Sequence, residues 1–65
     1  MTQANRLKEI RRLLLEKREL KTREIASYFG ISFDTARRDV LRLTETGQAL
    51  RIHGGIMAVD DDSVP

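Results

Sequence analysis

The sequence has no cysteine, and this absence excludes several classes of protein at once. Neither a disulfide nor a thiolate metal site can form, so the usual stabilisers of small secreted domains are missing. Long apolar runs are missing too, because runs such as Leu13-Leu14-Leu15 are far short of the roughly 20 residues that a membrane helix needs. The N-terminus lacks the charged and then apolar layout of a signal peptide. We therefore expect a cytoplasmic protein with no membrane partner.

Signs of catalysis are also missing. A chain of 65 residues buries only about 60% of its unfolded surface, which leaves little room for an enclosed substrate pocket. The sequence contains no nucleophile elbow, phosphate-binding loop or zinc motif. Its one histidine, His53, has no second histidine or cysteine to complete a metal site, and a solvent-facing turn residue explains it better. We expect neither an enzyme nor a bound cofactor or metal.

The charged residues, which make up 34% of the chain, are unevenly distributed. Residues 1–59 contain all 12 Lys and Arg side chains against seven acidic ones, a net charge of +5 for this part. The remaining acids form the run Asp60-Asp61-Asp62. A basic body followed by an acidic linker suits a nucleic-acid-binding domain. An ordinary solvated surface explains these charges equally well, so charge alone does not decide the function.

Helical periodicity predicts a first helix over residues 3–17. Leu7, Ile10 and Leu14 recur at the spacing of one apolar helix face, and no glycine or proline interrupts the segment. Leu20 follows as a single apolar residue among charged ones. It is compatible with a very short strand.

The next part of the sequence has the spacing of a helix-turn-helix unit. A short helix is predicted over about residues 22–29, with Thr22 as a plausible N-cap but without a complete capping box. Gly30 follows, where a helix end favours the left-handed conformation that glycine adopts readily. Ser32 is then a strong N-cap for a third helix over about residues 33–46. A tight turn of this kind joins two helices that cross at about 90–120°.

The third helix is predicted to bury one face and to expose a polar one. Ala36, Val40 and Leu43 share the buried face at the helical repeat, and Gly47 is expected just beyond the helix end. Asp39 flanks the buried face and is expected to bond to an arginine or to a backbone amide. The exposed face carries Asp34, Thr35, Arg38, Arg42 and Glu45, with Arg37 beside it.

Residues 50–59 are predicted to form a β-hairpin with Gly54-Gly55 as its two-residue turn. This register gathers four apolar side chains on one face of the hairpin, and only the outward position of Ile56 fits it poorly. The predicted pairs are His53–Ile56, Ile52–Met57, Arg51–Ala58 and Leu50–Val59.

Together these elements predict an α+β domain that is mostly α. It is a winged helix-turn-helix, with three helices and a C-terminal β-hairpin wing over residues 1–59. Residues 60–65 have no periodicity and are interpreted as the start of a linker to a further, C-terminal domain.

The predicted recognition helix, residues 33–46, has the side chains that duplex DNA requires. Cations that contact phosphates supply affinity, and side chains that reach base edges supply sequence choice. The N-terminal turns of such a helix enter the major groove, so we expect Arg38 to bind guanine and Thr35 to contact a base or a phosphate. Arg37 and Arg42 are expected on phosphates, and the wing on the adjacent backbone or in the minor groove. The predicted DNA-binding residues are Ser32, Phe33, Asp34, Thr35, Arg37, Arg38, Arg42, Arg51 and His53.

Two of these residues have a structural alternative. Arg38 follows Asp34 by four residues, acid first, which is the favourable order for a helical ion pair. Arg38 can therefore be held by Asp34 instead of a base. Phe33 can lap over the core instead of facing DNA.

The motif that runs from Ser32 to Asp39 as Ser-x-x-Thr-x-Arg-Arg-Asp, followed by His53-Gly54-Gly55, strongly resembles the N-terminal domain of DeoR-family regulators. The resemblance covers Leu7 to Gly55. It implies a winged helix-turn-helix repressor of carbohydrate-utilisation genes. It also implies a larger C-terminal domain that senses a phosphorylated sugar and mediates oligomerisation.

The same resemblance implies DNA-facing roles for particular residues, which are Ser32, Thr35, Arg37 and Arg38 on the helix and Arg51 and His53 on the wing. The sequence also departs from the family pattern. Ala36 replaces a larger aliphatic residue, and Phe33 is atypical at a position that tunes operator choice. The glycine that usually links the first two helices is missing, since Arg18-Glu19-Leu20 fills this link.

Binding of double-stranded operator DNA is therefore the leading hypothesis, and two others compete with it. A winged-helix protein-interaction module would need an exposed apolar patch on the third helix, where Arg38 and Arg42 dominate instead. An RNA-binding domain would favour exposed aromatic side chains, for which only Phe33 qualifies. We expect the chain alone to be a monomer that binds weakly, and the intact protein to be a homo-oligomer with two half-sites.

Overall fold

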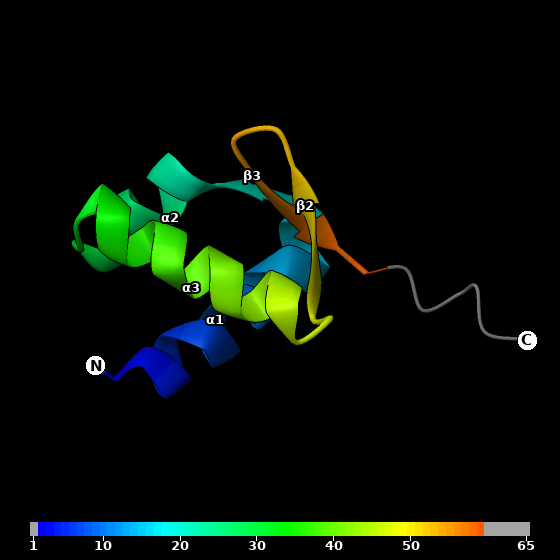
Figure 1. Ribbon diagram of the computed structural model, residues 1–65, viewed down its shortest axis with the longest axis horizontal. Helices are drawn as coiled ribbons and strands as arrows, with labels where there is room; N and C mark the ends of the chain where they lie inside the picture. Colours follow the sequence, from blue (N-terminus) through cyan, green and yellow to red (C-terminus); the bar gives the residue numbers. More distant parts are fainter. Residues whose placement is uncertain (1, 60–65) are drawn as a thin grey trace, which may run out of the picture.

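The computed structural model describes residues 2–59, which form three helices and one antiparallel sheet of three strands. In chain order the elements are α1 (Gln3–Lys17), β1 (Glu19–Lys21), α2 (Thr22–Phe29), α3 (Phe33–Glu45), β2 (Ala49–Ile52) and β3 (Gly55–Ala58). Figure 1 shows α2 beside the start of α3, and the β2–β3 hairpin rising from the end of α3. The predicted winged helix-turn-helix, α+β and mostly helical, is confirmed.

The predicted helices are observed at almost the predicted bounds. The α2–α3 turn has the expected chemistry, with Gly30 in the left-handed conformation at a φ of 66° and Ser32 as the N-cap of α3. Helix α3 ends one residue earlier than predicted, at Glu45, and Gly47 follows at a φ of 75°. No helix within residues 2–59 combines the length and the apolar character that a membrane span requires. The predicted linker, residues 60–65, lies outside the described residues.

The start of α2 corrects the sequence prediction. Lys21, not Thr22, is the N-cap, and the carboxylate of Glu24 accepts a hydrogen bond from the Lys21 amide at 2.8 Å. This bond satisfies one of the amides that a helix start leaves without a partner. Thr22 is the first helical residue and is buried. Its side-chain type suggested a cap, but the hydrogen bond that the Lys21 amide donates to Glu24 identifies the N-cap as the residue before it.

The hairpin register predicted from the sequence is wrong: the turn lies one residue earlier, and each residue of β2 pairs two positions earlier on β3 than predicted. The two turn residues are His53 and Gly54, and Gly55 already belongs to β3. A shift of two leaves the grouping of side chains by face unchanged, so Leu50, Ile52 and Met57 still share one face. The buried face is the opposite one, which carries Ile56 together with Ala49 and Ala58. The face that was expected to be buried is therefore the outward one, and half of the surface of Leu50 is exposed. The observed pairs are Ala49–Ala58, Leu50–Met57, Arg51–Ile56 and Ile52–Gly55.

The strand order β1-β3-β2 explains the error. The short strand around Leu20 adds to the hairpin, so that Leu20 pairs with Ile56 and Lys21 with Gly55. A Cβ atom on Gly55 would collide with the carbonyl oxygen of Leu20 and would lie 2.8 Å from the Cα atom of Lys21. Gly55 is therefore required by the close approach of β1, and only Gly54, with a φ of 79°, is required by the turn.

The link between α1 and β1 contains a strained residue. Arg18 has a φ of 70° and is the only non-glycine residue among residues 2–59 with a positive φ. Its amide donates a hydrogen bond to the carbonyl oxygen of Leu14 at 2.8 Å, and its own carbonyl oxygen accepts one from the amide of Ala58 at 2.8 Å. These two bonds hold Arg18 in a conformation that a glycine in this link would adopt with little strain.

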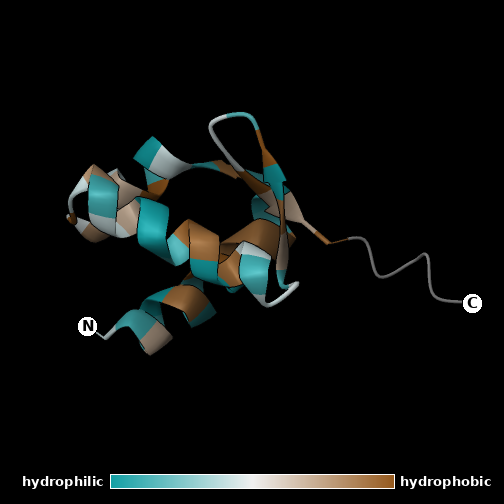
Figure 2. Cartoon of the chain, in the orientation of Figure 1, coloured by the Kyte–Doolittle hydropathy of each residue, from teal (hydrophilic) through white to brown (hydrophobic). Residues whose placement is uncertain are grey.

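One hydrophobic core joins the helices to the sheet. The prediction that Ala36, Val40 and Leu43 form the buried face of α3 is confirmed. Figure 2 shows the hydrophobic segments of α1, α3 and the sheet adjoining one another at the centre of the molecule. The largest fully buried apolar side chains are Ile10, Leu14, Ile25, Leu43 and Ile56. Because each of them contributes about 1.5–3 kcal/mol by burial, the core holds α3 and the wing in one fixed arrangement.

Candidate nucleic-acid interface

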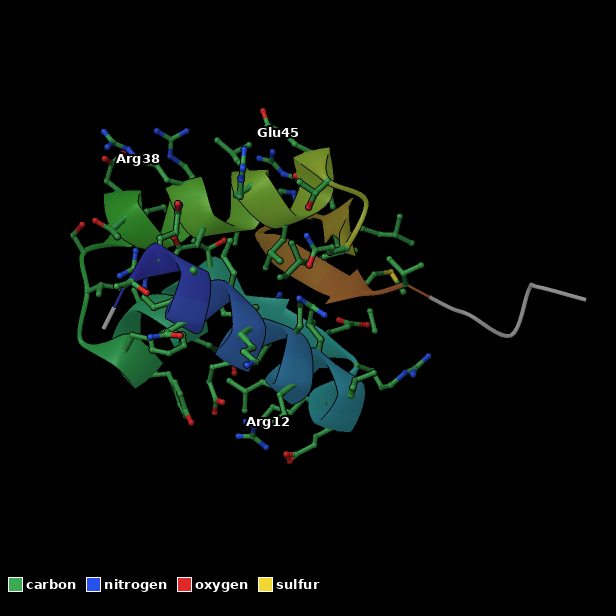
Figure 3. The ribbon with its side chains drawn as sticks, turned by 90° about the horizontal axis from the view of Figure 1, so that it is seen from below. Arg12, Arg38 and Glu45 are labelled. Atoms are coloured by element: carbon green, nitrogen blue, oxygen red, sulfur yellow. The ribbon has the colours of Figure 1, made fainter. Side chains whose placement is uncertain are left out.

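The outer side of α3 is polar and accessible. Figure 3 shows Arg38 and Glu45 projecting from the side of α3 that points away from α1, whose Arg12 lies on the opposite side of the molecule. The side chain of Arg38 is 73% exposed, that of Arg37 is 53% exposed, and Arg42 is exposed as well. We call these three residues of α3 the arginine face. Side chains of this length and charge can reach phosphates or base edges without moving the helix.

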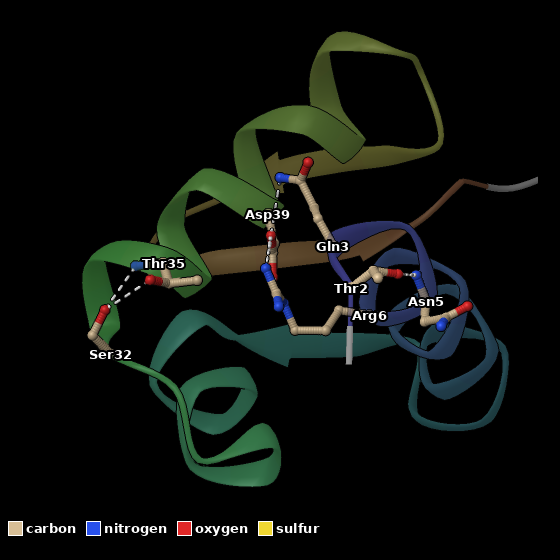
Figure 4. Close-up of polar contacts among 7 residues, drawn as sticks. All are labelled: Thr2, Gln3, Asn5, Arg6, Ser32, Thr35 and Asp39. Carbon is tan, nitrogen blue, oxygen red and sulfur yellow. Dashed lines mark hydrogen bonds and ion pairs between the residues drawn. The ribbon is translucent and has the colours of Figure 1, made fainter.

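Two hydroxyl groups meet at the N-terminus of α3 (Figure 4). Ser32 Oγ accepts a hydrogen bond from the amide of Thr35 at 3.1 Å and donates one to Thr35 Oγ1 at 2.9 Å. The Thr35 hydroxyl hydrogen is then available to donate to another acceptor. A helix N-terminus also favours negative charge, because its first amides and the helix dipole are positive. This end of α3 thus has the polarity to approach an anionic backbone.

Asp34 contacts two of the three arginines. Its Oδ1 atom lies 3.1 Å from Nη2 of Arg37, and its Oδ2 atom lies 3.1 Å from Nη2 of Arg38. The sequence left open whether Arg38 is held by Asp34, and the structure contains this ion pair. The pair with Arg37 was not expected. Both pairs are exposed to solvent, so they are weak and can exchange with other partners.

Phe33, the first residue of α3, is 57% exposed and does not belong to the core. It lies instead at an open concavity between the start of α3 and the turn of the wing. The residues that line this concavity are Lys21, Arg23, Glu24, Phe33, His53 and Gly54. The structure thus brings Phe33 and His53 to one surface, whereas Arg51, exposed on the edge strand β2, is not part of the lining.

Lys21 and Arg23 are basic residues of this surface that the sequence analysis missed. Both are exposed, at the N-terminal end of α2. They come close to the wing because β1 joins the sheet and because the amide of Thr22 donates a hydrogen bond to the carbonyl oxygen of Gly54 at 2.9 Å. Only the pairing of β1 with β3 could have indicated this, and a three-residue strand gives almost no sequence signal.

A buried ion pair lies under the arginine face. Asp39 of α3 is completely buried, and its Oδ2 atom accepts a hydrogen bond from Nε of Arg6 at 2.7 Å. Gln3 Nε2 donates to Oδ1 of the same carboxylate at 3.2 Å (Figure 4). The bond to Asp39 raises the pKa of Arg6, so this guanidinium stays charged. The prediction of a structural Asp39 bonded to an arginine is confirmed, and the pair ties α3 to the first turns of α1.

A second polar cluster joins α1 to α2 on the side away from the arginine face. Glu9 accepts hydrogen bonds from Arg12 at 2.6 Å and from the hydroxyl of Tyr28 at 2.9 Å. These bonds, that from Arg12 first, lower the pKa of Glu9 from 4.5 to about 2, and the bond to Glu9 raises the pKa of Tyr28. Within residues 2–59 no three side chains of metal-binding type gather around one point. The hydrogen bond from Tyr28 to Glu9 links α2 to α1.

The comparison with known families agrees with this geometry. The family model of the DeoR-like helix-turn-helix domain matches residues 6–62. The chain belongs to this family. The resemblance carried by the Ser32 to Asp39 motif is thereby confirmed.

Curated relatives in the DeoR-like family match the chain over 55 residues, which are 85% of its length. The lactose phosphotransferase system repressors of Staphylococcus epidermidis and Staphylococcus aureus are 38% identical over this segment. The HTH-type transcriptional regulator IolR of Bacillus subtilis is 29% identical. The chain spans only 22% of the length of these relatives. No solved structure is a significant match.

Proposed function

We propose that this chain is the DNA-binding domain of a bacterial transcriptional regulator and that it binds double-stranded operator DNA sequence-specifically. The observation that carries the proposal is the arginine face of α3, which stands clear of the other elements in a domain of the DeoR-like family. In this proposal α3 enters the major groove, and the wing contacts the adjacent backbone or the minor groove. The function needs no catalytic group, cofactor or metal, and it belongs in the cytoplasm, where bacterial operators are.

The N-terminal half of α3 reads the bases in this proposal. Arg38 has the most exposed side chain among the arginines of the described ion pairs, and its guanidinium can form two hydrogen bonds with a guanine, worth about 1–3 kcal/mol of discrimination. Phe33 offers an apolar surface to a thymine methyl group, an interaction that major-groove readers use. Ser32 and Thr35 supply hydroxyl donors beside them.

Phosphate contacts come from several basic side chains around α3. Arg37 and Arg42 flank the reading positions on α3 itself. Lys21 and Arg23 line the concavity beside Phe33, where a backbone strand passing between α3 and the wing would meet them. On the wing, His53 lies at this concavity, and Arg51 extends the basic surface along β2. Each phosphate neutralised releases counterions, so these residues supply affinity without sequence preference.

The regulated genes and the effector belong to the intact protein. Because relatives of the chain include lactose phosphotransferase system repressors, we propose a repressor of carbohydrate-utilisation genes. A phosphorylated sugar would bind to a C-terminal domain outside this chain, and a homo-oligomer would place two copies of this domain on two half-sites. The 65-residue chain by itself would be a monomer with weak affinity.

Titration of wild-type chain and an Arg38→Ala variant tests the proposal. Both are added to a labelled duplex taken from upstream of the chain's own gene and to a scrambled duplex, at two salt concentrations. Wild type is expected to prefer its own site. Its affinity should fall as salt rises, and the logarithm of the binding constant should decrease by about 0.9 per phosphate contact for each tenfold increase in salt concentration. The Arg38→Ala variant is expected to lose the preference.

Arg11→Ala is the matched control, because it removes one arginine from the exposed surface of α1 near Leu14 and Val59, outside the proposed interface. It should leave the preference unchanged. If wild type binds neither duplex at low salt, the proposal is wrong. If Arg11→Ala and Arg38→Ala lose equal affinity on both duplexes, binding is by charge alone and α3 is not the reader.

A protein-interaction domain is the alternative function. It is favoured by one observation, the outward face of the wing, where Leu50 is half exposed and Ile52 and Met57 are partly exposed. The arginine face argues against it, because three exposed cations on α3 do not suit an apolar protein contact. Failure of the wild-type chain to bind duplex DNA would make this alternative the leading one.

A further inference from the structure

Asp34 stands out on the arginine face because, among residues 2–59, it is the one acid that forms ion pairs with its arginines. Each of its two carboxylate oxygens pairs with a different guanidinium, Arg37 at 3.1 Å and Arg38 at 3.1 Å. Its side chain is 54% exposed, so it lies on the surface that would meet DNA and not beneath it. A carboxylate that binds two guanidinium groups imitates the contact that a DNA phosphate would make with them.

We propose that Asp34 is a specificity-determining residue that competes with phosphates for Arg37 and Arg38 and thereby suppresses binding to DNA of the wrong sequence. This inference rests on the proposed function. On random DNA the two arginines gain only phosphates, and they give up one carboxylate in exchange for another anion. The released Asp34 is left in the negative field of the duplex without a partner. The net gain on random DNA is therefore small.

On the correct sequence the exchange differs. Arg38 gains the paired acceptors of a guanine, which no carboxylate on the protein surface replaces. The Asp34 carboxylate can also find a new partner there, since a carboxylate accepts a hydrogen bond from the amino group of a cytosine. The repulsion that every DNA exerts on Asp34 is then offset only where the bases are right. Specificity through an unfavourable contact with the wrong partner is a general device of recognition.

The test compares wild type with Asp34→Asn and with Glu45→Gln. Glu45 lies on the same outward side of α3 (Figure 3), and among residues 2–59 it has no ion pair with an arginine. Both substitutions therefore remove one negative charge from α3, but only Asp34→Asn releases arginines. The probes are a pool of random-sequence duplex and the best duplex selected from that pool by the wild-type chain. Dissociation constants are measured by fluorescence anisotropy across a range of salt concentrations.

Asp34→Asn is expected to bind the random pool three- to tenfold more tightly than wild type, with a steeper salt dependence. Its affinity for the selected duplex should increase by a smaller factor. The ratio of the two affinities therefore falls. Glu45→Gln should change binding to the random pool less than twofold. Asp34→Glu, which keeps the charge, should lie closer to wild type than to Asp34→Asn. Far-UV circular dichroism confirms that the variants are folded.

Two outcomes overturn the inference while leaving the proposed function in place. In the first, wild type binds duplex DNA with steep salt dependence, but Asp34→Asn affects the random pool no more than Glu45→Gln does. In the second, Asp34→Asn strengthens binding to both probes equally, so that the affinity ratio is unchanged. Absence of any duplex binding by wild type would instead reject the proposed function, and the inference with it.

Discussion

Arg6 and Asp39 form a 2.7 Å ion pair between α1 and α3, and Asp39 has no exposed surface. A buried carboxylate without a partner is unfavourable, because burial removes its hydration. Arg6 supplies the positive charge, and Gln3 a further hydrogen bond. The pair lies on the inner side of the helix whose outer side carries the arginine face. The orientation of the proposed DNA-binding surface therefore depends on it.

Arg6→Ala is expected to lower the free energy of unfolding by about 3 kcal/mol or more, because it leaves the Asp39 carboxylate buried and uncompensated. For a domain of this size such a loss lowers the melting temperature by more than roughly 10 °C. Thermal unfolding followed by circular dichroism measures it. Arg11→Ala, an exposed arginine of the same helix, is the control. Equal melting temperatures for the two variants would contradict the role assigned to the pair.

Glu9 predicts a dependence of stability on acid pH. Its pKa is about 2 in the folded protein and 4.5 without its partners, which are Arg12 first and then Tyr28. A carboxylate with a lowered pKa stabilises the fold fully above its unfolded value, and this stabilisation disappears as the pH falls. Stability should therefore decrease as the pH falls from about 4.5 to about 2.

Urea unfolding at several pH values between 6 and 2 measures this dependence. Glu9→Gln should make the acid decrease shallower, because the amide does not titrate in this range. Tyr28→Phe removes one of the three hydrogen bonds that Glu9 accepts and leaves the two from Arg12, so it should have a smaller effect in the same direction. If the free energy of unfolding of Glu9→Gln fell with pH in parallel to that of wild type, a group other than Glu9 would dominate the loss of stability in acid.

Gly55→Ala is expected to separate β1 from β3. The new Cβ atom would collide with the Leu20 carbonyl oxygen, and neither backbone can yield without loss of sheet hydrogen bonds. A loss of about 1–3 kcal/mol is typical of such overpacking and is measured by thermal unfolding. Gly54→Asn is the comparison, since nothing lies near its Cβ position and asparagine tolerates a positive φ. If Gly54→Asn destabilised the protein as much as Gly55→Ala or more, the turn, and not the close approach of β1, would explain why both positions are glycine.

Arg18→Gly is expected to stabilise the protein. Arg18 holds a φ of 70°, a region that disfavours a residue with a Cβ by roughly 1–2 kcal/mol. Part of that gain is offset by the greater freedom of glycine in the unfolded chain, so we expect a net gain of about 0.5–1 kcal/mol. Arg18→Ala separates strain from charge, because it removes the charge but keeps the Cβ atom. It should show no such gain in the same melting experiment.

The helices could be predicted from the sequence because their signals are local. The apolar spacing of Leu7, Ile10 and Leu14, the cap at Ser32 and the glycine at position 30 each act within one or two turns. The structural role of Asp39 was predictable for the same reason, since a charged residue beside a buried face requires a partner such as an arginine or a backbone amide. The identity of that partner, Arg6, was not predictable, because it lies 33 residues away in the sequence.

The hairpin register depended on a contact that no local pattern reveals. Both Gly54 and Gly55 suit a tight turn, and the chain around Leu20 is too short to be recognised as the strand that excludes a side chain at position 55. The outward position of Ile56 was the one sign that the wrong face of the hairpin had been expected to be buried. Lys21 and Arg23 were missed for the same reason, because they approach the wing only through this strand.

The strand order also determines when the domain can form during protein synthesis. Strand β3 is the last element described, yet it lies between β1 and β2 and carries the buried Ile56. A nascent chain that has reached only Gly54 contains two strands with no partner between them and a core that lacks one of its largest side chains. The helices can begin to form earlier, but α3 and the wing reach their mutual positions only after Ala58 has left the ribosome. Assembly of the proposed DNA-binding surface is thus a single step that waits for the last strand of the domain.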